Sequence, residues 1–159
     1  MNCVLDRDPI KVFAYRVHAH ALGTVISGYR YAPSEKQWTQ VAKGNPQWPQ
    51  AFYPMEHIIH ISRGDLLFAR CTYNSTNKDT ITEIGSTSND EMCNLYLMYY
   101  SPNPMAAPMI GRHSQMYSLM RQGGGYQDVC EGSQLQSSEY TLPTGNDEPL
   151  PRNVTLEES

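Results

Sequence analysis

Short runs of alternating apolar and polar residues, separated by glycines and prolines, follow one another from residue 10 to residue 100. Runs of this kind that are rich in β-branched and aromatic residues are typical of strands. The pattern predicts strands over residues 10–20, 23–31, 38–42, 58–61, 65–73 and 92–100. Because no segment has a convincing helical period, the fold is predicted to be all-β, an antiparallel β-sandwich of jelly-roll type.

The composition of the chain changes after Gln122. Three consecutive glycines are followed by a stretch dominated by serine, glutamine, glutamate, proline and asparagine, which is typical of disordered segments. We therefore expect one folded domain over residues 1–130 and a disordered tail or linker over residues 131–159. The methionines between Met105 and Met120 are interpreted as core or loop residues rather than as one side of a helix.

Charge and length narrow the class of protein. Charged side chains make up 18% of the chain, the net charge is -4, and no run of lysine or arginine occurs. This distribution argues against nucleic acid as a partner. At 159 residues the chain is long enough to bury a core of its own.

The chain contains four widely spaced cysteines: Cys3, Cys71, Cys93 and Cys130. They form no Cys-x-x-Cys motif, so they predict two disulfides, with all three pairings open, rather than a zinc site. The sequons at Asn74 and Asn153 also point to the secretory pathway. Since no signal peptide precedes the charged residues 6–8, we expect a fragment of a longer protein that acts in the secretory pathway, in a secretory granule or outside the cell.

Side-chain alternation brings three polar residues together at the end of the first predicted strand. Arg16, His18 and His20 share a face, because residues two apart on a strand point the same way and lie about 6.5–7 Å apart. Two imidazoles at that spacing can bind one metal ion. On the last predicted strand the same parity gives a second set of residues: Met92, Asn94 and Tyr96.

The ligand types indicate the metal. Imidazole nitrogen suits zinc, copper and iron, whereas thioether sulfur selects copper, above all reduced copper. If the two strands were neighbours, their side chains would form a mononuclear copper site beside a cation, an amide and a phenol. The alternation permits this arrangement but does not require it, since two histidines on an outer face and a methionine in the core give the same pattern.

The remaining histidines are weaker candidates. His57 and His60 are three residues apart, so a strand would point them to opposite faces, and we interpret them as structural. His113 lies in an irregular stretch and is assigned no role. The chain has no nucleophile elbow, phosphate loop or His-Glu-x-x-His motif.

Several segments within about residues 3–100 together resemble the peptidylglycine α-hydroxylating monooxygenases, which are ascorbate-dependent type II copper enzymes. The segments are residues 12–20, 22–23, 25–30, 45–47, 49–54, 87–88 and 90–96. The related dopamine β-monooxygenases share the His-x-His pair and the methionine. The Tyr-Arg-Val before His18 and the Asn-Leu-Tyr after Cys93 are more similar to the peptide-amidating branch.

The resemblance implies that the chain is the second, catalytic copper domain of such an enzyme. The copper ligands it implies are His18, His20 and Met92. The carboxylate-binding residues it implies are Arg16, Asn94 and Tyr96. They would hold the C-terminus of a glycine-extended peptide, whose terminal α-carbon is hydroxylated with O2 and with electrons from ascorbate. A peptidyl-hydroxyglycine lyase would then release the amidated peptide.

Further implications concern the disulfides and the rest of the enzyme. The resemblance implies the pairs Cys71–Cys93 and Cys3–Cys130. It also implies an N-terminal copper domain that passes electrons to this one and that the chain lacks, so we do not expect efficient turnover by this chain alone. Two alternatives stay open: a non-catalytic secreted β-sandwich binding module, and a dopamine β-monooxygenase-like hydroxylase.

Overall fold

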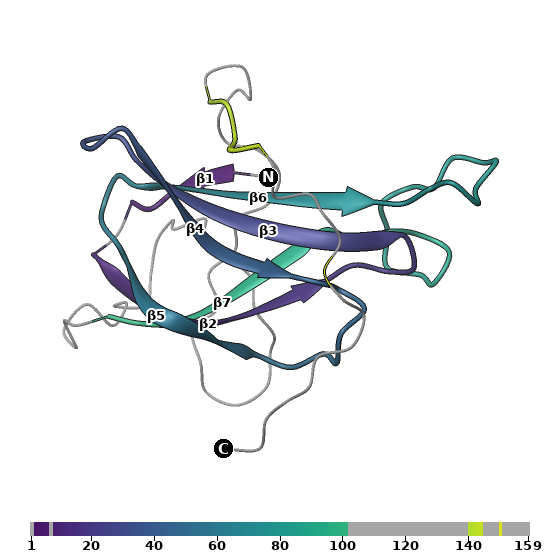
Figure 1. The fold of residues 1–159 in the computed structure, drawn as a ribbon, viewed down its shortest axis with the longest axis horizontal. Coiled ribbons are helices and arrows are strands. Elements are labelled where there is room, and N and C mark those ends of the chain that lie inside the picture. Colours follow the sequence, from purple (N-terminus) through teal and green to yellow (C-terminus); the bar gives the residue numbers. More distant parts are fainter. Residues whose placement is uncertain (1, 7, 102–139, 145–149, 151–159) are drawn as a thin grey trace, which may run out of the picture.

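Two sheets face each other as the layers of a sandwich (Figure 1). The computed structural model describes residues 2–6, 8–101, 140–144 and 150. Within these residues the structure has seven strands and no helix, and all strand pairs are antiparallel. The predicted all-β antiparallel sandwich is therefore confirmed. No helix in this part of the chain is long and apolar enough to cross a membrane.

The first sheet has the strand order β1-β6-β3-β4 and the second has the order β5-β2-β7. The strands of the first sheet are β1 (Asn2–Val4), β6 (Leu66–Tyr73), β3 (Gly23–Ala32) and β4 (Gln37–Gly44). The strands of the second sheet are β5 (Tyr53–Ile61), β2 (Ile10–His18) and β7 (Asn94–Tyr100). The central strand of the second sheet, β2, therefore lies between two strands that follow it much later in the sequence.

The apolar positions of β2 and β7 face the first sheet. Val17 packs with Ile26 of β3 and with Leu95 of β7, and Val12 belongs to the main core with Ile61. Gly28 makes room for this contact, because a Cβ there would overlap with the end of the Leu95 side chain, which would have to shift. The opposite face of β2 is thus free to carry polar residues, as the alternation predicts.

The strand ends differ from the prediction at the point that concerns function. β2 ends at His18 rather than at residue 20, and β7 begins at Asn94 rather than at residue 92. The chain turns a corner after His18, because β2 and β3 belong to different sheets. β5 is also longer than predicted, and β1 was not predicted because three residues carry little periodic signal.

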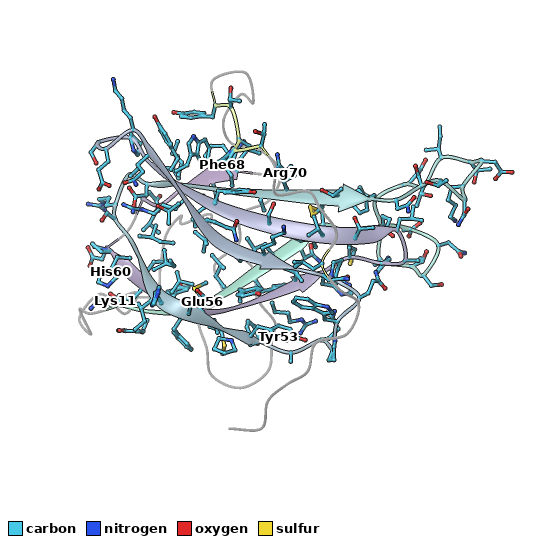
Figure 2. The ribbon with its side chains drawn as sticks, viewed as in Figure 1. Lys11, Tyr53, Glu56, His60, Phe68 and Arg70 are labelled. Carbon is cyan, nitrogen blue, oxygen red and sulfur yellow. A yellow bond between two sulfur atoms is a disulfide. The ribbon has the colours of Figure 1, made fainter. Side chains whose placement is uncertain are left out.

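Residues 140–144 lie against the first sheet. Tyr140 and Leu142 pack on a cluster of Tyr29, Leu66 and Phe68, and Arg70 donates a hydrogen bond to the carbonyl of Pro143. Figure 2 shows Phe68 and Arg70 on this sheet, and Lys11, Glu56 and His60 on the other. These contacts fall within the range predicted as a tail, and the domain boundary near residue 130 stays a prediction.

Several predictions fall outside the described residues. They concern Cys130, His113, Asn153 and the methionines from Met105 to Met120. Cys3 is disulfide-bonded, but its predicted pairing with Cys130 involves one of these residues. His57 and His60 are both on β5, where His57 is exposed and His60 is partly exposed, and their interpretation as structural residues stays a prediction.

Candidate metal centre

The pairing of β2 with β7 brings the two predicted sets of polar residues together. His18 lies directly opposite Asn94 in the register, and Arg16 lies opposite Tyr96. Since residues two apart on a strand share a face, all four side chains belong to the face of the second sheet that points away from the core. His20 lies just after the end of β2, and Met92 lies just before the start of the neighbouring strand, β7.

The two imidazole rings lie close together and perpendicular to each other. Their centroids are 5.3 Å apart with an interplanar angle of 83°. Two imidazoles bound to one tetrahedral metal through bonds of about 2 Å would have centroids roughly 5 Å apart. The rings therefore have the spacing that a shared metal ion requires.

Hydrogen bonds fix the tautomer of His18. Its Nδ1 lies 3.1 Å from Gln50 Oε1, which also accepts a hydrogen bond of 3.2 Å from Arg16 Nε. The Gln50 amide nitrogen donates to the Pro46 carbonyl, so the amide orientation is set from both ends. Because Oε1 can only accept, His18 Nδ1 carries the proton and Nε2 has a lone pair for a metal.

His20 is held in the same tautomer by a different partner. Its Nδ1 lies 2.8 Å from the backbone carbonyl of Asp90, which can only accept. The proton is therefore on Nδ1, and Nε2 again has its lone pair available. Fixing each ligand through its other ring nitrogen is how proteins orient metal-binding histidines.

Glu91 joins the two segments that carry His20 and Met92. Its carboxylate is buried, with 4% of the residue exposed. It accepts hydrogen bonds from the backbone N–H groups of His20 at 2.8 Å, Leu22 at 2.6 Å and Met92 at 3.2 Å. These bonds replace the strand ladder after His18, which explains why β2 ends there although the side-chain alternation continues.

The thioether of Met92 lies on the polar face. Asn94 Nδ2 donates to Met92 Sδ at 3.6 Å, and the second sulfur lone pair remains for a metal. The Met92 carbonyl accepts a hydrogen bond of 2.9 Å from the Tyr73 hydroxyl. Burial, and then the negative charge of Glu91, raise the pKa of Tyr73 above its ordinary value of 10.0, so the phenol stays a donor.

A tight turn presents the Asp90 carbonyl to His20. The Asp90 carboxylate accepts hydrogen bonds from the Thr87 hydroxyl at 2.7 Å and from the Thr87 backbone N–H at 3.0 Å. These bonds lower the pKa of Asp90 below its ordinary value of 3.8, the side-chain bond having the larger effect. A side chain that bonds to its own turn in this way fixes the backbone locally.

The predicted carboxylate-binding residues are also neighbours. The Arg16 guanidinium stacks over the Tyr96 ring, with its central carbon 5.1 Å from the ring centroid. Stacking on one aromatic face orients the planar guanidinium, a group that can bind a carboxylate through a forked pair of hydrogen bonds. Asn94 lies between this pair and Met92 along the same face.

The disulfide Cys71–Cys93 is present, as predicted. It joins the end of β6 in the first sheet to the residue between Met92 and Asn94. Cys93 therefore points toward the first sheet while its two neighbours point away, in agreement with the predicted parity. This bond anchors the start of β7.

Two side chains that help to orient the candidate ligands, those of Gln50 and Glu91, were not predicted from the sequence. Neither follows a periodic pattern, because Gln50 lies in an irregular loop and Glu91 precedes the strand. Their hydrogen bonds to His18 and His20 span 32 and 71 positions in the sequence. The one available signal was that both lie inside segments that carry the resemblance.

Replacing Gln50 with leucine is expected to weaken copper binding roughly 10- to 100-fold, as for other partners that orient metal ligands. Leucine has a similar size but cannot accept the proton of His18 Nδ1. Copper competition with a chromophoric chelator measures the affinity. The matched control is Gln37→Leu on β4, an exposed position, and an unchanged affinity in Gln50→Leu would contradict the assigned role.

The donor set fits copper. In the described part of the chain no three His, Cys, Asp or Glu side chains gather as a metal site. The candidate centre instead combines two imidazoles with a thioether, and this combination favours copper over zinc or iron. Residues His18, His20 and Met92 could hold the ion, with Gln50, Asp90 and Glu91 orienting them.

Comparison with known proteins identifies a family and several relatives. A family profile for the C-terminal domain of copper type II ascorbate-dependent monooxygenases matches residues 1–120. Peptidylglycine alpha-amidating monooxygenase of Rattus norvegicus is 52% identical over 100 residues, which are 63% of this chain and 10% of the relative. Peptidyl-glycine alpha-amidating monooxygenase A of Xenopus laevis is 50% identical over 98 residues, or 62% of this chain and 10% of the relative.

A more distant relative is the tyramine beta-hydroxylase of Caenorhabditis briggsae, 29% identical over 98 residues, which are 60% of this chain and 17% of the relative. The chain thus spans about a tenth of the length of the two amidating monooxygenases. The profile match covers well over half of the chain. The chain belongs to the copper type II ascorbate-dependent monooxygenases, as their C-terminal domain.

Proposed function

We propose that this domain holds the copper at which the terminal glycine of a glycine-extended peptide is hydroxylated on its α-carbon. The observation that carries the proposal is the register of β2 and β7, in which the Arg16–Tyr96 pair lies next to the His18–Asn94 pair. Residues two apart along a strand are separated by about 6.5–7 Å. A carboxylate bound at the first pair therefore puts the adjacent α-carbon within about that distance of the His18 imidazole.

In this proposal His18, His20 and Met92 hold the copper through two imidazole Nε2 atoms and one thioether. When bound, copper supplies the redox chemistry through which O2 and electrons from ascorbate hydroxylate a carbon. Arg16 binds the peptide carboxylate through its forked N–H groups, and Tyr96 holds the guanidinium flat. Gln50 Oε1, shared by Arg16 and His18, couples the position of the carboxylate to that of the imidazole.

The rest of the reaction needs components other than this domain. We propose that an N-terminal copper domain delivers electrons and that a peptidyl-hydroxyglycine lyase consumes the hydroxylated product. The disulfide Cys71–Cys93 supports a location in the secretory pathway, since disulfides persist in oxidising compartments. A secretory granule or the extracellular space satisfies the same condition.

Replacing Arg16 with alanine is expected to weaken binding of a glycine-extended peptide about 10- to 100-fold, because hydrogen bonds to a charged group contribute about 1.5–3 kcal/mol. Copper affinity is expected to change much less, since Arg16 contributes no proposed ligand. Isothermal titration of the copper-loaded protein with peptide, and separate copper competition, measure the two affinities.

Arg63→Ala is the matched control, because Arg63 is exposed and bonds to the backbone carbonyl of Asp6 in a distant turn. A peptide whose C-terminus is already amidated lacks the carboxylate and should bind poorly to the native protein. Equal losses of peptide and copper affinity in Arg16→Ala would argue against the substrate role. Binding of a phenethylamine in preference to the peptide would favour the activity named for the tyramine beta-hydroxylase.

A further inference from the structure

The loop that follows β6 contains the sequon Asn74-Ser75-Thr76 in a defined local conformation. Asn74 Oδ1 accepts hydrogen bonds from the Thr76 hydroxyl at 2.6 Å and from the Thr76 backbone N–H at 3.0 Å. The Asn74 side-chain nitrogen, Nδ2, has no hydrogen-bond partner among the described residues. The acceptor amide and the hydroxyl that a sequon requires are thus in direct contact.

This contact needs three consecutive residues and no tertiary structure. It can therefore form in a nascent chain, at the stage when the folded domain does not yet exist. The two hydrogen bonds to the Asn74 amide oxygen draw electron density away from the amide nitrogen. This favours loss of a proton from that nitrogen. The local structure around Asn74 thus favours transfer of a sugar to its side-chain nitrogen.

The folded domain also has room for a glycan at this position. Asn74, Ser75 and Thr76 are all exposed, and so are the residues on either side of them. The Asn74 backbone N–H donates to the carbonyl of Leu22, which fixes the base of the loop while its side chains face solvent. In Figure 1 the loop extends beyond the end of β6, away from both sheets.

We propose that Asn74 carries an N-linked glycan. In the transfer, Asn74 Nδ2 loses a proton and bonds to the anomeric carbon of an oligosaccharide carried on a lipid diphosphate. The bond from that carbon to the diphosphate breaks, and the lipid diphosphate leaves. The proposal concerns a covalent modification and does not depend on copper binding or hydroxylation.

Mass spectrometry of the full-length protein from animal cells tests the proposal. Trypsin should release residues 71–78 as one peptide after reduction, because it cleaves after Arg70 and after Lys78. Glycosidase treatment in heavy-oxygen water converts a glycosylated asparagine to labelled aspartate. We expect the label at Asn74 and none at Asn77, which lies in the same peptide but has Asp79 in place of the required hydroxyl residue.

Four variants make the result specific. Asn74→Gln and Thr76→Ala should each remove one glycan from the protein on electrophoresis, whereas Thr76→Ser should keep it. Removal of the Asn153 sequon by Asn153→Gln should leave the Asn74 label unchanged. An unlabelled, unmodified residue 74 in the native protein, or a label that survives Thr76→Ala, would overturn the proposal.

Discussion

Replacing Glu91 with glutamine is expected to lower the free energy of unfolding by about 3 kcal/mol and to weaken copper binding roughly 10- to 100-fold. The Glu91 carboxylate accepts three backbone N–H groups, from the chain around both His20 and Met92. Glutamine keeps the size but turns one acceptor oxygen into a donor, which must face an N–H group in a buried site. At least one backbone donor then loses its partner.

Urea unfolding followed by circular dichroism measures the first effect, and copper competition measures the second. Glu83→Gln is the matched control, because Glu83 lies in the same region but is exposed, and we expect a change within about 0.5 kcal/mol. A Glu91→Gln protein that unfolds and binds copper like the native one would show that Glu91 does not hold the two segments together.

Removing the Cys71–Cys93 disulfide in a double serine variant is expected to destabilise the domain by roughly 3 kcal/mol, as the entropy of a closed loop of this length indicates. The two cysteines are 22 positions apart, and the loop between them contains the turn that presents Asp90 to His20. The same substitution frees the residue between Met92 and Asn94. Copper affinity should therefore fall together with stability.

Thermal unfolding and copper competition on the double variant measure these effects. Both cysteines are replaced so that no unpaired thiol remains to bind copper or to form new disulfides. Addition of copper should recover part of the lost stability, because a ligand that binds only the folded state stabilises it. If the copper-free double variant unfolded at the same temperature as the copper-free native protein, the anchoring role of the disulfide would be contradicted.

Much of the polar face could be predicted from the sequence because strand geometry is local. Arg16 and His18 share a face simply because they are two residues apart, and the burial of Val17 between them follows from the same rule. The opposite orientation of Cys93 relative to Met92 and Asn94 has the same origin. These features needed only the existence of the two strands.

The features that depend on distant parts of the chain could not be predicted from alternation. Pairing of β2 with β7 brings together residues 76 to 89 positions apart, and it follows from the packing of Val17 and Leu95 against the first sheet. Only the resemblance placed these strands together in advance. The ends of both strands were predicted two residues too far, because Glu91 takes the backbone N–H groups that a longer ladder would use.

The central claim is that one copper ion is held by two imidazoles and one thioether on the outer face of the second sheet. X-ray absorption spectroscopy of the protein loaded with reduced copper tests it directly. We predict imidazole and sulfur scattering in the native protein, loss of the sulfur contribution in Met92→Leu, and its retention in Met98→Leu, where the exposed methionine lies on β7, which follows Met92. Absence of sulfur in the native spectrum, or its persistence in Met92→Leu, would contradict the account.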